Sequence, residues 1–444
     1  MSRRAVSGLA ALGVLVAGLL VALAVLQAGE AQRAAAARRA AHGGDLFAEL
    51  ADPSRIGSFG HGAWSWFQDP RAVHVGGPNG RTFVGWIAWD GAITVGAYDP
   101  VRGLARTHVL GYWIHDDHAS PAILVEPDGR LTVFWSGHNG HTMDFRTTRR
   151  PEDISSWGPV QHLHARLPGD LGFTYPNPVL LPAEHDKLYL FWRGASWSTD
   201  YVTRTVTGRW SKPRQLIAVA GERPYVKFAS NGRDQIALAF TNAHPRNTIT
   251  SVYYAVYRHG SLWTAGGRWI ARIGKGPIAP SQADLVYNGP RARVASWVWD
   301  VALARDGDPV IVYATFPSAS DDAYWYARWN DHRWVSHFLT LGGPSISSGT
   351  LETEYAGGVA LDHADPSILY LSKKAGRRFE IERWVTGDGG YRWRHATVID
   401  TGGDAVRPVV PRGAGGPIRL VWMSGDYGRY IHYRTSIAFL TGTT

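Results

Sequence analysis

The feature that most constrains this chain is a short apolar strand that recurs seven times along it. Continuous or alternating apolar residues over five positions are typical of a buried strand. The seven copies occupy residues 82–86, 131–135, 188–192, 236–240, 310–314, 369–373 and 419–423. Their average spacing of about 56 residues favours a propeller or a solenoid, in which one structural unit is repeated.

Most copies follow another apolar strand and a turn, and most precede an aromatic strand such as residues 324–329. The fifth unit, which we expect to start near residue 284, is the least regular. Four strands per unit, repeated radially, leave only short and protected sheet edges. We therefore predict an all-β, seven-bladed β-propeller over residues 55–444. The abundance of Trp, Tyr and Gly suits many short strands and tight turns. A parallel β-solenoid is the alternative, but its turns are usually much shorter and it lacks this hairpin pattern.

Residues 386–393 read Thr-Gly-Asp-Gly-Gly-Tyr-Arg-Trp. This matches the Asp-box of sialidase-type propellers except for Arg392, which replaces a Thr. In such a box the Asp fixes a hairpin turn and the Trp packs between strands. The motif therefore supports the fold and predicts no catalytic role.

The N-terminus contains an uncharged run of 22 residues, 5–26, after Arg3 and Arg4. At about 1.5 Å per residue, a helix of this length crosses a hydrocarbon core of about 30 Å. We predict an N-terminal membrane anchor or signal segment at residues 1–27 and a stalk or linker at 28–54. The favoured location is the cell membrane, single-pass, with the propeller outside the cytoplasm. Small residues at 24–31 suit a signal peptidase, so a secreted body is the alternative.

The amino-acid composition excludes several kinds of site and partner. The chain has no Cys, which excludes disulfides, thiolate zinc sites and Cys nucleophiles. Its formal charge is +9, and five of its Arg lie before residue 42. The body has no dense Lys/Arg run or stacked aromatic RNA motif, so no nucleic-acid partner is expected. The positive excess suits an acidic polysaccharide or oligosaccharide. We expect a monomer.

One hairpin pairs two histidines. Residues 119–125 and 131–135 are apolar strands joined by a Pro-Asp-Gly turn at 127–129. Because the strands are antiparallel, the start of the first and the end of the second lie at the same end of the sheet. The sequence therefore predicts that His118 and His138 lie close together.

The next two hairpins repeat this arrangement. Tyr175 opens a strand, and Arg193 ends its returning partner at residues 188–192. Tyr225 opens another strand, and His244 follows the partner at residues 236–240. Three neighbouring hairpins thus place three imidazoles, two phenols and one guanidinium at one mouth of the predicted channel.

These side chains suit proton abstraction beside a carboxylate. The C5 hydrogen of a uronic acid becomes acidic only when the sugar's carboxylate is neutralised. Arg193 offers a permanently charged fork for that task. A Tyr or His can take the proton, and another can protonate the departing O4. The product would be an unsaturated uronate, formed without water.

The sequence also resembles the BNR-repeat (BNR-4 type) propeller family that contains ulvan lyases and rhamnosyl-glucuronate lyases. The matching segments are residues 64–71, 116–118, 136–138, 174–177, 191–194, 223–226, 244–246, 297–300 and 355–358. The resemblance implies a polysaccharide lyase. It implies that His118, His138 and Tyr175 form the acid/base set and that Arg193 neutralises the substrate carboxylate. It also implies that Tyr225 and His244 line the substrate site.

Several alternatives stay open at this point. Arg193 can instead pair with Asp117 or Asp300, and the Asp residues at positions 69, 116, 117 and 300 are interpreted as fold-holding. A propeller that binds glycans without turnover is the second functional reading. A sialidase-type hydrolase is the third and would need three convergent arginines, for which Arg71, Arg193 and Arg246 are candidates.

The sequence gives little indication of a metal or cofactor. A zinc site made of His118, His138 and His244 is conceivable, but no carboxylate that would support those imidazoles is evident. We therefore predict no metal in the catalytic site and no certain cofactor. A structural calcium ion, as in some members of the family that the chain resembles, stays open without assigned ligands.

Overall fold

The computed structural model describes residues 52–77, 79–165, 167–349 and 352–442. The predicted N-terminal segment, residues 1–27, and most of the predicted stalk lie outside these residues. Within the part of the chain that the structure describes, no helix is long and apolar enough to cross a membrane. Membrane attachment and the location of the protein therefore stay predictions.

The described residues form seven antiparallel sheets, which we call blades 1 to 7 in chain order. Blade 1 is β2 (Ala72–His74), β3 (Thr82–Ile87), β4 (Ala92–Asp99) and β5 (Leu104–Tyr112). Blade 2 is β6 (Ala122–Val125), β7 (Leu131–Trp135), β8 (Met143–Thr147) and β9 (Gln161–Leu163). Blade 3 is β10 (Thr174–Leu181), β11 (Lys187–Arg193), β12 (Thr199–Arg204) and β13 (Arg214–Ile217).

Blade 4 is β14 (Tyr225–Ser230), β15 (Gln235–Thr241), β16 (Val252–Arg258), β17 (Ser261–Trp263), β18 (Trp269–Arg272) and β19 (Asp284–Tyr287). Blade 5 is β20 (Ser296–Leu303), β21 (Pro309–Thr315), β22 (Asp322–Trp329) and β23 (Trp334–Gly343). Blade 6 is β24 (Val359–Leu361), β25 (Ile368–Ala375), β26 (Arg378–Thr386) and β27 (Trp393–Ile399). Blade 7 is β28 (Ala405–Val409), β29 (Ile418–Arg429), β30 (His432–Thr441) and β1 (Ile56–His61).

Short helical segments join some strands. They are η1 (Pro53–Arg55), η2 (Asp117–Ala119), η3 (Pro182–Glu184), η4 (Ala195–Trp197), η5 (Pro280–Gln282) and α2 (Gly289–Ala292). Segment η2 immediately precedes β6, and η4 immediately follows β11. Both therefore lie at the same end of their blades, where the first strand begins and the second ends.

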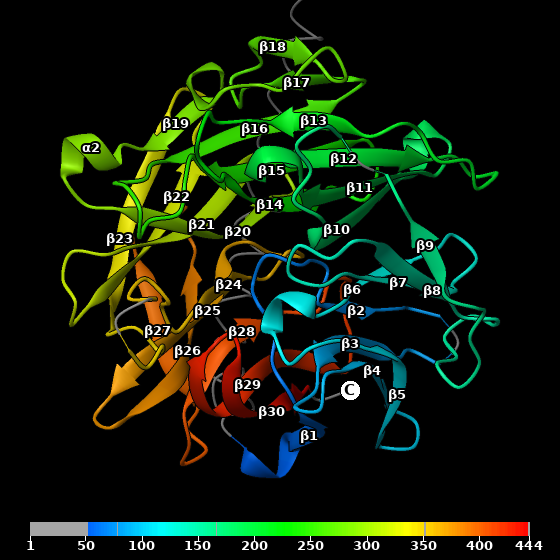
Figure 1. Ribbon diagram of the computed structural model, residues 1–444. Coiled ribbons are helices and arrows are strands. Elements are labelled where there is room, and N and C mark those ends of the chain that lie inside the picture. Colours follow the sequence, from blue (N-terminus) through cyan, green and yellow to red (C-terminus); the bar gives the residue numbers. More distant parts are fainter. Residues whose placement is uncertain (1–51, 78, 166, 350–351, 443–444) are drawn as a thin grey trace, which may run out of the picture. The chain divides into compact units, whose positions relative to one another are not determined.

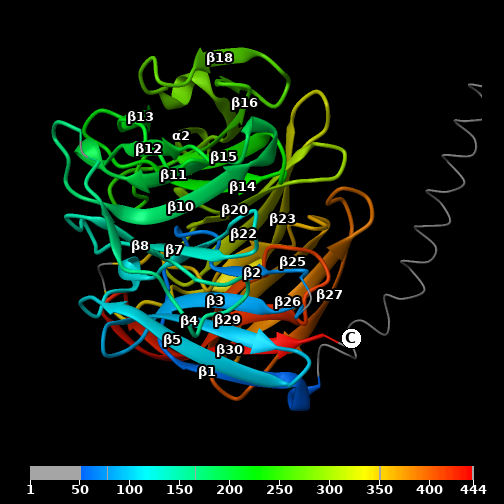
Figure 2. The same ribbon diagram turned by 90° about the vertical axis from the view of Figure 1, so that its right-hand side faces the viewer.

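The seven predicted apolar strands are the second strands of the seven blades, from β3 to β29. The blades follow one another around a ring, with first strands such as β6, β14, β20 and β24 nearest its centre (Figure 1). Strand β1, the first described, pairs with β30, the last, and so closes the ring (Figure 2). The all-β, seven-bladed propeller is therefore confirmed. Residues 284–287, expected to begin the fifth repeat, instead pair with β16 in blade 4.

The Asp-box has the structural role that its sequence predicts. Asp388 Oδ1 accepts hydrogen bonds from the backbone N of Arg392 at 2.8 Å and from Thr386 Oγ1 at 2.9 Å. Trp393 Nε1 donates to the carbonyl of Gly390 at 2.9 Å. These contacts fix the turn between β26 and β27, at the opposite end of the blade from the predicted catalytic residues.

Candidate active site

A cavity of about 390 Å³ opens at the predicted end of the ring. Five of the six predicted side chains line it: His118, His138, Arg193, Tyr225 and His244. They come from three neighbouring blades, as the hairpin argument predicts. The sixth, Tyr175, is buried beside them and is not among the residues that line the cavity.

The two histidines of blade 2 lie face to face. His118 belongs to η2 and His138 follows β7, and the paired strands β6 and β7 bring both to one end of the blade. Their ring centroids are 3.9 Å apart and the rings are inclined by 4°. The prediction that this hairpin pairs them is confirmed.

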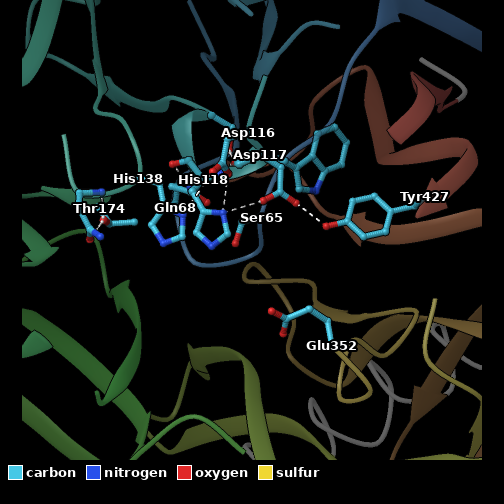
Figure 3. Close-up of polar contacts among 12 residues, drawn as sticks. Ser65, Gln68, Asp116, Asp117, His118, His138, Thr174, Glu352 and Tyr427 are labelled. Atoms are coloured by element: carbon cyan, nitrogen blue, oxygen red, sulfur yellow. Dashed lines mark hydrogen bonds and ion pairs between the residues drawn. The ribbon is translucent and has the colours of Figure 1, made fainter. Parts of the chain in front are cut away.

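Asp116 holds both histidines (Figure 3). Its Oδ1 contacts His118 Nδ1 at 2.6 Å, and its Oδ2 contacts His138 Nδ1 at 3.2 Å. Oδ1 also accepts a hydrogen bond from the backbone N of His118 at 2.9 Å, which caps η2. Asp116 is therefore more than the fold-holding group expected from the sequence, because it fixes the orientation of both imidazoles.

The shared carboxylate gives the two rings different proton affinities. Burial lowers the pKa of His118, but the neighbouring Asp116 and Asp117 outweigh it and raise this pKa to about 9. Burial and the charge of His118 lower the pKa of His138 to about 4, against the opposing effect of Asp116. Near neutral pH the pair therefore combines a charged His118 with a neutral His138. The His138 side chain is 27% exposed, against 6% for His118.

Arg193 ends β11 and is buried among aromatic rings. Its Nη1 donates to the hydroxyl of Tyr225 at 3.1 Å, and its Cζ lies 4.7 Å from the centroid of the Tyr175 ring. Its Nε and Nη2 are buried and have no hydrogen-bond partner among the described residues. Arg193 forms no ion pair with a carboxylate of those residues either. The guanidinium thus retains donor capacity inside a cavity.

The two aspartates proposed as competing partners of Arg193 are engaged elsewhere. Asp117 Oδ2 pairs with Arg407 Nη1 at 2.6 Å. Asp300 contacts His363 Nε2 at 3.1 Å and Arg412 Nη2 at 3.5 Å. Asp300 therefore agrees with the fold-holding interpretation, whereas Asp117 also contacts His118 Nδ1 through its Oδ1 at 3.2 Å and helps to keep that ring charged.

Tyr175 lies between the histidine pair and Arg193. Its ring centroid is 5.3 Å from that of His118, and its backbone has a φ of 63°, a left-handed conformation rare for a bulky residue. The amide of Asn177 donates to the Tyr175 carbonyl at 2.9 Å and to the carbonyl of Phe67 at 2.8 Å. Burial raises the pKa of Tyr175 well above its usual value, so the phenol stays protonated.

Tyr225 and His244 form the blade 4 side of the cavity. Their ring centroids are 5.5 Å apart. His244 Nδ1 accepts a hydrogen bond from the backbone N of Arg246 at 3.1 Å. Burial and the charges of Arg223 and Arg246 lower the pKa of His244 far below its usual range. His244 is therefore a neutral ring suited to binding.

The structure adds cavity residues that the sequence reasoning missed. The most distinctive are Glu352, on the connection between β23 and β24, and Tyr430, on the turn between β29 and β30. The Tyr430 ring meets those of His118 and His138 edge-on, at centroid distances of 5.0 and 5.9 Å. The other added lining residues are Arg223, Ser347, Ser348, Gly349, Tyr355 and Arg429. Arg246 also lines the cavity, and the sequence had suggested it only for a sialidase-type site.

No local sequence signal could have placed Tyr430. It reaches the histidines only because β1 closes blade 7 onto blade 1. The segment 355–358, by contrast, was a signal near Glu352, since it had been matched to the family that the chain resembles.

The three arginines considered for a sialidase-type site do not converge. Arg71 is fully buried and donates to the carbonyls of Gly85 and Gln68, at 3.2 and 2.9 Å. It does not line the cavity, whereas Arg193 and Arg246 do. The arrangement therefore does not favour that class of hydrolase.

One group of carboxylate and imidazole donors is compact enough to compare with a metal site. Among the described residues, Asp116, His118 and His138 offer ligand atoms within 4.8 Å of one another, and His244 is not part of this group. The two imidazole rings are parallel, however, so their in-plane lone pairs run side by side instead of converging on one point. Both Nδ1 atoms already contact Asp116. The arrangement fits a shared carboxylate better than a bound ion.

Comparisons with known proteins agree with this fold. Residues 81–340 match the model of the BNR repeat-containing family. An ulvan lyase of Nonlabens ulvanivorans is 22% identical over 356 residues, which cover 70% of each chain.

Two solved structures share the fold. One is an ulvan lyase, a polysaccharide lyase bound to a saccharide of glucuronic acid linked to 3-sulphated rhamnose. It superposes with a TM-score of 0.67 at 16% identity, over 87% of this chain and 95% of that chain. The other is the BP39L lectin of Burkholderia pseudomallei, with a TM-score of 0.51 at 12% identity over 81% and 93% of the two chains. The match of the family model over more than half of the sequence, on a seven-bladed ring, shows that this chain belongs to the BNR repeat-containing family.

Proposed function

We propose that this protein is a polysaccharide lyase that cleaves uronic-acid-containing glycans by β-elimination. The observation that carries the proposal is a buried arginine, Arg193, which has no carboxylate partner among the described residues and shares one cavity with two histidines of opposite protonation state. The similarity to an ulvan lyase supports the same class of substrate.

Arg193 would neutralise the carboxylate of the sugar that is cleaved. Tyr225 engages only Nη1, and Nε and Nη2 have no partner among the residues that the structure describes. These two nitrogens form one edge of the guanidinium and can donate two parallel hydrogen bonds to a carboxylate. Charge that develops on the carboxylate as the C5 proton leaves would then be stabilised in a poorly solvated site.

His138 is proposed as the base. Its ring is neutral near pH 7 and it is the more exposed histidine of the pair. It would take the C5 proton, and the electrons of the C5–H bond would delocalise into the neutralised carboxylate. As the bond from C4 to O4 breaks, those electrons form the double bond between C4 and C5.

His118 is proposed as the acid that protonates the departing O4. Asp116 keeps it charged, and the 3.9 Å stacking distance places it beside the base. Neighbouring acid and base suit an elimination in which the C5 hydrogen and O4 lie on the same side of the sugar ring. Tyr175 would position Arg193 and His118. Its high pKa keeps the phenol protonated, which suits a proton donor and not the base.

The test is to incubate the full chain with ulvan, gum arabic and other glucuronate glycans. We expect a rise in the ultraviolet absorbance of a conjugated uronate and products whose masses show no added water. The variant His138→Ala should lose turnover and keep saccharide binding. His162→Ala is the matched control, because His162 is an exposed histidine bound to Asp144 on the outer part of blade 2. Binding without turnover on every uronate glycan, or products with added water, would overturn the proposal.

A further inference from the structure

One acidic side chain lines an otherwise basic cavity. Among the described lining residues, Glu352 is the sole carboxylate, beside Arg193, Arg223, Arg246 and Arg429. It lies across the cavity from His118 and His138 (Figure 3). A carboxylate here opposes the binding of anions at one wall, so its presence calls for an explanation.

The two oxygens of Glu352 have different surroundings. Oε1 accepts a hydrogen bond from Arg246 Nη1 at 2.8 Å. Oε2 is buried, lies 3.6 Å from His244 Nε2 and has no hydrogen-bond partner among the described residues. The side chain is only 9% exposed, and burial raises the pKa of Glu352 against the opposing charge of Arg246. Buried acceptors are normally satisfied, so Oε2 is available to a donor on a ligand.

We propose that Glu352 selects a sugar with a free hydroxyl group at this wall and rejects a sulphate ester there. The substrate would then be a uronate glycan in which the sugar facing Glu352 is unsulphated. This inference rests on the proposed function and names the substrate more narrowly.

Hydrogen bonding explains why Glu352 would favour a hydroxyl group over a sulphate ester. A sugar hydroxyl can donate to Oε2, and a hydrogen bond to a charged acceptor is about twice as strong as one between neutral groups. A sulphate ester offers only acceptor oxygens and a negative charge, which a buried carboxylate repels. Arg246 Nη1 already binds Oε1 of Glu352, so the charge of this arginine is partly offset before a sulphate arrives.

The selection applies to this wall alone. Arg223 and Arg429 also line the cavity and form no ion pair with a carboxylate of the described residues, so anionic groups can bind elsewhere. The proposal thus separates this chain from the solved ulvan lyase, whose bound saccharide carries a sulphated rhamnose.

The experiment compares ulvan with the same ulvan after chemical desulphation. For the full wild-type chain we expect kcat/KM to be at least about tenfold higher on the desulphated glycan, the factor that 1.4 kcal/mol of repulsion produces. In Glu352→Gln this ratio should fall towards one, chiefly through a gain on the sulphated glycan. Glu354→Gln makes the same change in charge two residues away, outside the cavity lining, and should keep the wild-type ratio.

The wild-type ratio needs no variant, so it decides the question even if Glu352→Gln folds poorly. A wild-type preference for sulphated ulvan, or an unchanged ratio in a folded Glu352→Gln, would overturn the inference. If neither glycan yields an unsaturated product, β-elimination fails as the function. Calorimetric titration of His138→Ala with both glycans then decides the role of Glu352, because tighter binding of the sulphated form would contradict it.

Discussion

Two buried arginines of the propeller differ in whether a carboxylate pairs with them. Arg407, on β28, is 1% exposed and pairs with Asp117 at 2.6 Å. Arg193, on β11, is 5% exposed and has no carboxylate partner among the described residues. Both lie among aromatic rings: Arg407 is 4.2 Å from the Tyr427 centroid and Arg193 is 4.7 Å from that of Tyr175.

The difference shows how to separate structural from functional charges. Burial lowers the pKa of Arg407, but Tyr427 and Asp117 raise it beyond its ordinary value, so the protein itself stabilises this charge. Tyr427 also donates a hydrogen bond to Asp117 at 2.7 Å, which completes the cluster. In the described part of the chain no carboxylate pairs with Arg193, and this residue lines a cavity that a ligand can enter.

The largest expected effect concerns the stability that Arg407 provides. Arg407→Leu removes one member of a buried ion pair and leaves Asp117 without its closest cation, which costs about 3 to 5 kcal/mol. Urea denaturation monitored by tryptophan fluorescence measures this loss. The double variant Arg407→Leu with Asp117→Asn should recover part of it. A change of less than about 1 kcal/mol in the single variant would show that the two arginines do not differ in the way we describe.

The next effect is on activity and concerns Arg193. Arg193→Lys keeps a positive charge but loses the planar fork, and we expect kcat/KM on a uronate glycan to fall by about 10² to 10³. The unfolding free energy should change much less than in Arg407→Leu, because no carboxylate is left unpaired. Arg233→Lys, a change on the turn between β14 and β15, is the control. Near-normal activity in Arg193→Lys would contradict the assigned role.

The smallest effect is a shift in pH dependence. Activity should fall at low pH as the base His138 gains a proton, around its pKa of about 4, and at high pH as His118 loses one, around about 9. Since the rings interact, both limits belong to the pair. Asp116 raises the pKa of His118, so Asp116→Asn should move the alkaline limit down by about 1 to 3 pH units.

The control for that shift is Asp144→Asn, which removes a carboxylate from His162 at the outer part of blade 2. It should leave the pH profile unchanged. An alkaline limit that stays in place in Asp116→Asn would show that Asp116 does not set the charge of His118.

Much of the fold followed from local pattern. The seven apolar strands, the hairpin turn at residues 127–129 and the Asp-box all describe segments whose partners are near in sequence. The fifth repeat was the exception, because β19 pairs back onto β16 of blade 4 and leaves α2 as a connection. Apolar periodicity reports that a strand is buried and does not report which neighbour it pairs with.

The sequence by itself determined the ring of seven blades and the meeting of His118, His138, Arg193, Tyr225 and His244, because antiparallel hairpins fix which strand ends lie together. Only the tertiary structure decided which carboxylate contacts each positively charged side chain. Asp116 contacts both histidines, Asp117 pairs with Arg407 and also contacts His118, and Glu352 and Tyr430 line the cavity from distant blades. Those contacts form only when the ring closes, because closure brings together segments that lie hundreds of residues apart. Such contacts produce no periodic pattern in the local sequence.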